Sequence, residues 1–209
     1  MTSVRPTRTS GRARSLLVES ALLIVIAAVI ALVLRAFVAQ AFSIPSASMS
    51  PQLLVGDRVV VSKLAYRLHD PNRGDIVVFD CPPGAGCPEP GVEPSLVVRG
   101  LLGLVEAVGL RAQSTEEYIK RVVAVPGETV EGRDGDVFVD GRRLVEPYLP
   151  PSATTSDFGP EVVRESELWV LGDNRTNSSD SRVFGSIEQD TVVGRATHRV
   201  WPPTRTAFL

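Results

Sequence analysis

Near the middle of the chain stands the run YIKRVVAVPG, residues 118–127. Its β-branched residues favour a strand, and the Pro-Gly pair at its end is a turn signal that stops the strand. The strand carries Lys120, one of two lysines in a chain with 22 basic residues. A lysine in a strand is usually a surface group that extends to water. The apolar neighbours of Lys120 instead favour a buried, neutral amine, which can act as a general base where arginine cannot.

Short runs rich in valine and isoleucine on both sides of this stretch predict further strands and a mostly β fold. Gly-Asp and Asp-Gly pairs between the runs are typical of turns and hairpins. We expect surface loops over 81–94 and 150–160, and a glycine-broken helix over 97–110 that packs on the domain or lies at a bilayer surface. The expected strands are 58–62, 75–80, 118–125, 129–131, 136–139, 143–145, 167–171 and 191–200.

An apolar stretch precedes the β region and has the length of a membrane span. Residues 16–38 are mainly apolar, and a helix of this length crosses a ~30 Å hydrocarbon layer. Residues 1–15 contain four arginines and no acidic residue, which places the N-terminus in the cytoplasm. The sequence therefore predicts a cytoplasmic tail at 1–15, one transmembrane helix at 16–38 and an extracytoplasmic domain at 39–209. The net charge of −2 leaves that domain mildly acidic, which argues against a nucleic-acid partner.

A cleaved signal peptide is the alternative interpretation of the N-terminal region. The basic tail fits it, and Ala39-Gln40-Ala41 has the small-x-small pattern of a cleavage site. We favour a retained anchor, because the apolar zone is long for a signal peptide. Retention also keeps Ser48, ten residues beyond Val38, within ~35 Å of the membrane.

Directly after the anchor comes a serine-rich run, FSIPSASMSP, at residues 42–51. The candidate nucleophiles are Ser43, Ser46, Ser48 and Ser50, and the two prolines restrict the backbone that displays them. A serine and a lysine can form a nucleophile and base without histidine, and neither histidine of this chain lies in a triad context. Lys63 is the rival base.

A third polar run, GDNRTNSSDSR, occupies residues 172–182 after an expected strand. A hydrogen-bonded loop explains part of this composition. The run holds more serines, aspartates and arginines than a turn requires. It can therefore also supply a hydroxyl that orients the lysine amine and an Asp–Arg pair that braces the loop.

The two cysteines, Cys81 and Cys87, lie in the expected surface loop with five residues between them. Two thiols make a poor metal site by themselves. On the extracytoplasmic side we expect a small disulfide-closed loop, with an unpaired pair of thiols as the alternative.

Taken together, the motifs resemble those of bacterial type I signal peptidases, membrane-anchored Ser/Lys endopeptidases. The resemblance covers about residues 36–203 and rests on four runs in the same order: IPSASMSP, RGDIVVF, YIKRV with VPG, and GDNR through DSR. It implies a complex, mostly β fold, shared more distantly with self-cleaving repressor proteases. The β lobe at 127–171 is short, and 81–113 is an insertion without an assigned motif.

The resemblance also implies a role for each candidate near the scissile bond. Ser48 becomes the nucleophile and Lys120 its general base. Ser46 donates its hydroxyl to the oxyanion hole beside the Ser48 amide, and Ser178 hydrogen-bonds the Lys120 amine and orients it.

By the same resemblance, Asp180 and Arg182 brace the loop, and no cofactor or metal takes part. The expected partners are secretory preproteins, cleaved after small-x-small motifs, and the lipid bilayer. The expected protein is a monomer that crosses the bacterial cell membrane once.

Two other functions are weighed against this one. A self-cleaving protease of the repressor kind lacks support, because the chain has an apolar N-terminal span and no DNA-binding domain. An anchored β domain that only binds partners predicts that Lys120→Arg is harmless.

Overall fold

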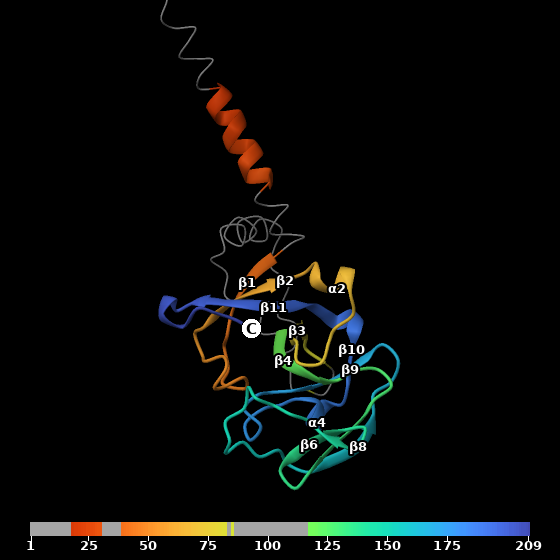
Figure 1. Cartoon of the computed structure of the whole chain (residues 1–209). Helices are drawn as coiled ribbons and strands as arrows, with labels where there is room; N and C mark the ends of the chain where they lie inside the picture. Colours follow the sequence, from red (N-terminus) through yellow and green to blue (C-terminus); the bar gives the residue numbers. More distant parts are fainter. Residues whose placement is uncertain (1–17, 31–38, 83–84, 86–116) are drawn as a thin grey trace, which may run out of the picture. The chain divides into compact units, whose positions relative to one another are not determined.

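The computed structural model describes residues 18–30, 39–82, 85 and 117–209 (Figure 1). The chain divides into two units, Met1–Val38 and Ala39–Leu209. In the first unit, residues 18–30 are helical, and the remainder of the expected span 16–38 lies outside the described residues. Of the helices in the described part of the chain, none combines the length and the apolar character needed to cross a membrane.

The second unit contains a large antiparallel sheet. Its strands follow the order β1-β2-β11-β3-β4-β9-β10, with β12 paired to β11. Two short helices, α2 and α4, lie in the connections. The strands are β1 (Ala39–Ser43), β2 (Arg58–Ser62), β3 (Ile76–Asp80), β4 (Glu117–Ala124), β9 (Glu167–Leu171), β10 (Ile187–Glu188), β11 (Val192–Trp201) and β12 (Ala207–Phe208), and the helices are α2 (Ala65–Leu68) and α4 (Ser181–Phe184).

A second, four-stranded sheet is formed by the chain between β4 and β9. Its order is β7-β6-β5-β8, all antiparallel. Figure 1 shows β6 and β8 at the end of the unit away from β1 and β2. The bounds are β5 (Thr129–Arg133), β6 (Asp136–Val139), β7 (Arg142–Arg143) and β8 (Phe158–Val162).

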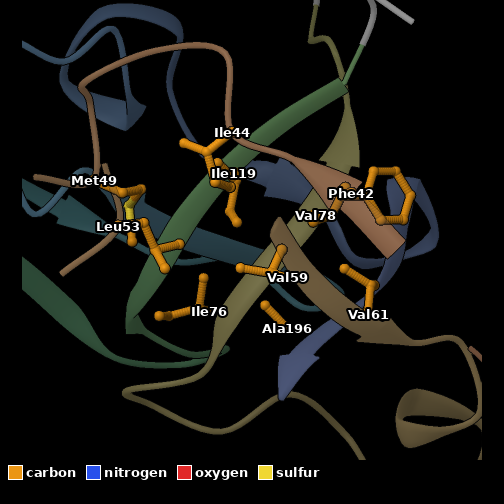
Figure 2. Close-up of a cluster of buried hydrophobic side chains, with 10 residues drawn as sticks. All are labelled: Phe42, Ile44, Met49, Leu53, Val59, Val61, Ile76, Val78, Ile119 and Ala196. Carbon is orange, nitrogen blue, oxygen red and sulfur yellow. The ribbon is translucent and has the colours of Figure 1, made fainter. Parts of the chain in front are cut away.

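The central strands are buried on both faces, which is why they consist of nearly continuous apolar residues. β3 is buried from Ile76 to Phe79, and β4 from Ile119 to Ala124. One core cluster gathers side chains of β1 to β4 and β11 together with Met49 and Leu53, as Figure 2 shows. The serine-rich run is therefore itself anchored in the core, through Phe42, Ile44 and Met49.

The mostly β fold expected from the sequence is confirmed, and most expected strands lie within one or two residues of the observed ones. β1 was not expected as a strand. β8 begins inside the polar loop expected over 150–160 and extends beyond it.

The insertion between β3 and β4 is described only in part. Cys81 is disulfide-bonded, and Cys87, the only other cysteine of the chain, lies outside the described residues. The helix expected over 97–110 also lies outside them.

Candidate active site

Ser48 lies in a tight turn between β1 and β2, where its side chain is nearly buried. The residue is 8% exposed, and the next residue, Met49, is fully buried in the core. Within the turn, the backbone N–H of Ser50 donates to the carbonyl oxygen of Ala47 at 3.0 Å. The core therefore fixes the backbone that carries the Ser48 hydroxyl.

A second restraint on this turn comes from Asn174, in the loop after β9. Its backbone N–H donates to the carbonyl oxygen of Ser48 at 2.9 Å, and its side-chain amide donates to Ala47 O at 3.1 Å. Sequence reasoning missed this contact. Asn174 stands inside the polar run at 172–182, but nothing in the sequence shows which residue of that run reaches the serine turn.

Lys120 lies on β4, and its amine points at the serine hydroxyl. Lys120 Nζ donates to Ser48 Oγ at 2.9 Å and to the carbonyl oxygen of Ile119 at 2.9 Å. The fold thus brings together two residues that are 72 positions apart in the chain. The contact joins a hydroxyl, which can become a nucleophile, to an amine that can take its proton.

Burial favours the neutral form of the Lys120 amine, which is the form that can accept a proton. The residue is 3% exposed. Desolvation lowers the pKa of Lys120 to about 8, against the opposing effect of the negative charges of Asp180 and Asp173, which raise it. Burial dominates, so a substantial fraction of the amine is neutral near physiological pH.

Ser46 stands two residues before the nucleophile candidate and reaches the same point in space. Its Oγ lies 3.2 Å from Ser48 Oγ, and either hydroxyl can donate in this pair. If Lys120 accepted the Ser48 proton, the Ser46 hydroxyl would remain able to donate. The geometry fits a donor to charge that develops next to Ser48 Oγ.

Ser178 lines the same pocket but does not make the expected hydrogen bond to Lys120. Its Oγ is buried and has no hydrogen-bond partner among the described residues. The Lys120 amine instead uses the carbonyl oxygen of Ile119. Ser178 Oγ packs against Gly172, a position with no room for a side chain.

Asp180 and Arg182 form a paired brace at the start of α4. Arg182 donates twice to the Asp180 carboxylate, at 2.8 Å each. Asp180 is fully buried and also accepts the backbone N–H of Gly172 at 3.0 Å. One carboxylate thereby ties the two ends of the polar run together.

Arg121, beside Lys120 on β4, forms a further buried ion pair. Its guanidinium donates to both carboxylate oxygens of Asp173, at 2.9 and 2.7 Å. Such fork-to-fork geometry fixes direction as well as distance. The pair fastens the polar run at 172–182 to the strand that carries the amine.

These side chains border a pocket of about 400 Å³. It lies along the first half of β4, where Glu117 to Lys120 pair with β3 on one side. The pairing with β9 begins only at Arg121, so among the described strands none pairs with the other edge of Tyr118 to Lys120. Lys63, the rival base, is not a lining residue; those are Pro45, Ser46, Ala47, Ser48, Glu117, Tyr118, Ile119, Lys120, Asn177, Ser178 and Ser179.

Comparisons with known proteins bear on the whole region. A family model described as signal peptidase, peptidase S26, matches residues 17–201. Signal peptidase I of Mycobacterium tuberculosis (strain CDC 1551 / Oshkosh) is 38% identical, covering 92% of this chain and 75% of the relative. Signal peptidase I of Leptolyngbya laminosa is 38% identical, covering 98% of this chain and 90% of the relative. The crystal structure of a signal peptidase I from Enterococcus faecalis is 29% identical, with a TM-score of 0.40, and covers 61% of this chain and 97% of that chain.

Proposed function

Since this chain belongs to the signal peptidase family, peptidase S26, we propose that it is a membrane-anchored endopeptidase that removes signal peptides from secretory preproteins. The observation that carries the proposal is the hydrogen bond from Lys120 Nζ to Ser48 Oγ inside a pocket. Ser48 is the proposed nucleophile and Lys120 the proposed general base.

In the first half of the reaction, neutral Lys120 takes the proton of Ser48 Oγ as the oxygen attacks the scissile carbonyl. The negative charge on the carbonyl oxygen is met by the Ser46 hydroxyl and the Ser48 backbone N–H, donors held in place beforehand. Protonated Lys120 then gives its proton to the departing amine. The product of this half is an acyl-enzyme on Ser48.

In the second half, a water molecule replaces the departed amine. Lys120 takes a proton from the water molecule as the water oxygen attacks the acyl carbonyl. The same two donors stabilise the second oxyanion, and the proton returns from Lys120 to Ser48 Oγ as the ester bond breaks. One amine thus serves as base and acid in both halves.

The open edge of β4 offers a place for the substrate backbone. An extended peptide that pairs with Tyr118–Lys120 runs directly beside the amine and the pocket. We expect the side chains of the small-x-small junction to enter this pocket. The proposed anchor is the apolar span 16–38, which keeps the catalytic domain near substrates held in the bilayer.

The direct test is to incubate the purified full chain, in detergent micelles, with a secretory preprotein that has alanine at both small positions. We expect one cut, after the second small residue, located by mass spectrometry. A matched preprotein with a large residue at that position should remain intact. Failure to cut the alanine substrate would contradict the proposed function.

The pH dependence of the reaction follows from the need for a neutral Lys120. Since burial lowers the pKa of this amine to about 8, kcat/KM should rise with pH through that value and then level off. On the acid side the protonated amine cannot accept a proton, so the rate should fall about tenfold per pH unit. The measurement is kcat/KM against pH, and constancy on the acid side would mean that another group is the base.

Loss of the Ser46 hydroxyl tests the proposed oxyanion donor. Ser46→Ala should lower kcat by ~10²–10³, the usual effect of removing one such donor, and leave KM nearly unchanged. Ser43→Ala, which removes an exposed hydroxyl from β1 in the same run, is the matched control and should behave as wild type. Equal kcat values for the two variants would remove Ser46 from the mechanism.

A further inference from the structure

Glu146 and Tyr148 lie in an irregular segment between β7 and β8, outside every motif that pointed to the active site. The Glu146 carboxylate nevertheless has three donors. Arg175 Nη1 donates to it at 2.9 Å, Arg175 Nη2 donates to its other oxygen, and the Tyr148 hydroxyl donates at 2.6 Å. Three hydrogen bonds thus fix a carboxylate that lies in a connecting segment between strands.

Arg175, the main partner of Glu146, belongs to the polar run behind the nucleophile. The residue is 4% exposed, so its charge is out of water. Its Nε donates to the carbonyl oxygen of Gly172 at 3.2 Å, and its Nη1 also donates to Thr155 Oγ1 at 2.9 Å. A buried guanidinium without a nearby acid destabilises the fold. The Glu146 carboxylate therefore allows Arg175 to remain buried and hydrogen-bonded to the Gly172 carbonyl oxygen.

Tyr148 reaches the same run by a second route. The guanidinium of Arg121 lies over the Tyr148 ring, 3.9 Å from its centre, and grips the Asp173 carboxylate with two hydrogen bonds. A cation over an aromatic face is attracted to it, and more strongly so away from water. Glu146 and Tyr148 are hydrogen-bonded to each other, and each contacts one arginine. These arginines in turn hydrogen-bond two successive residues of the polar run, Gly172 and Asp173.

The next residue of the run, Asn174, contacts the nucleophile turn. Its backbone N–H donates to Ser48 O at 2.9 Å. Gly172 lies so close to that turn that a β-carbon on it would stand 2.5 Å from Ser48 O. A shift of the loop at Gly172–Asn174 would therefore move the Ser48 backbone, and with it the Ser48 hydroxyl relative to Lys120.

We propose that Glu146 and Tyr148 are positioning residues for the Ser48–Lys120 pair, acting through Arg175 and Arg121 on the loop at Gly172–Asn174. The inference rests on the proposed peptidase function. Neither residue lines the pocket, so their effect falls on the alignment of the reacting groups and not on contact with substrate.

The test compares Glu146→Gln with Asp136→Asn in the full chain, using the preprotein assay. Glu146→Gln keeps the shape of the side chain and removes the charge that holds Arg175. We expect kcat to fall by ~10–100-fold, with KM within about twofold of wild type, because misalignment of reacting groups acts on the chemical step. Asp136→Asn removes the acid of an exposed ion pair between β6 and β7, Asp136 with Arg143, and should leave both constants unchanged.

A second variant guards against a simple loss of folding. Glu146→Gln/Arg175→Met removes both charges of the buried pair, so no unpaired guanidinium remains to destabilise the fold. It still lacks the bond from Arg175 to Gly172 O. Its kcat should therefore stay as low as that of Glu146→Gln alone, with a normal thermal unfolding midpoint, since the two changes break one chain of contacts.

Three results would overturn the inference. They are wild-type kcat in Glu146→Gln, wild-type kcat in the double variant, or a raised KM with unchanged kcat in either. All three presuppose that the wild-type chain cleaves the preprotein. A wild-type chain that does not cleave it would instead contradict the proposed function itself.

Discussion

Ser48→Ala is expected to abolish preprotein cleavage. The substitution removes the hydroxyl oxygen that Lys120 Nζ contacts at 2.9 Å, and no acyl-enzyme can form without it. Losing the nucleophile of a serine peptidase lowers kcat by at least about 10⁴-fold. The measurement is the amount of mature product over time, with enough enzyme to detect this residual rate.

The fold should survive this change. Ser48→Ala removes a single hydroxyl, and Lys120 Nζ keeps its bond to the carbonyl oxygen of Ile119. Ser50→Ala is the matched control, because Ser50 belongs to the same turn and is not a lining residue of the pocket. It should cleave at the wild-type rate. Cleavage by Ser48→Ala at a comparable rate would move the nucleophile to another serine.

Lys120→Arg is expected to be as inactive as the serine variant. A guanidinium stays protonated at any workable pH and cannot accept the proton of Ser48 Oγ. The change retains the positive charge and removes the ability to accept a proton. It therefore distinguishes a role of Lys120 as a base from a role as a cation. Turnover by Lys120→Arg would contradict the Ser/Lys mechanism, because a group other than Lys120 would then have to act as the base.

Two further variants complete this experiment. Lys120→Met has nearly the same length and no charge to bury at a site that is 3% exposed, so it should fold and be inactive. Lys63→Arg changes the only other lysine of the chain, which is not among the residues that line the pocket. This variant should retain full activity. Loss of activity would instead indicate that Lys63 is the base.

The sequence predicted those strands whose formation depends on local residue preference. The valine-rich runs of β2 and β4 are examples. β1 has no β-branched residue and forms because Ala39–Ser43 pair in register with β2, a long-range contact without a local signal. β8 contains Gly159 and Pro160, which normally argue against a strand, and tolerates them because it is the edge of its sheet.

The candidate site divides in the same way. The composition left two lysines as candidate bases, and the run at 42–51 left four serines as candidate nucleophiles. The choice of Ser48 and Lys120 among them came from the resemblance to signal peptidases. The pairing of Glu146 with Arg175 could not be predicted, because both lie in irregular segments 29 residues apart and no periodic pattern connects them. Ser178 was expected to hydrogen-bond the Lys120 amine. It does line the same pocket, but its Oγ has no hydrogen-bond partner among the described residues.

The shortness of the open β4 edge has a kinetic consequence. From Tyr118 to Lys120 the edge offers only a few backbone hydrogen bonds, each contributing about 0.5–1.5 kcal/mol net. Their sum reaches at most the low end of the ~4–15 kcal/mol that association costs in translational and rotational freedom. A free peptide should therefore bind weakly and leave quickly, and the released fragments should scarcely inhibit. If the chain is anchored as proposed, substrate confined to the same bilayer would arrive at a high effective concentration, and the membrane would replace affinity as the source of efficient capture.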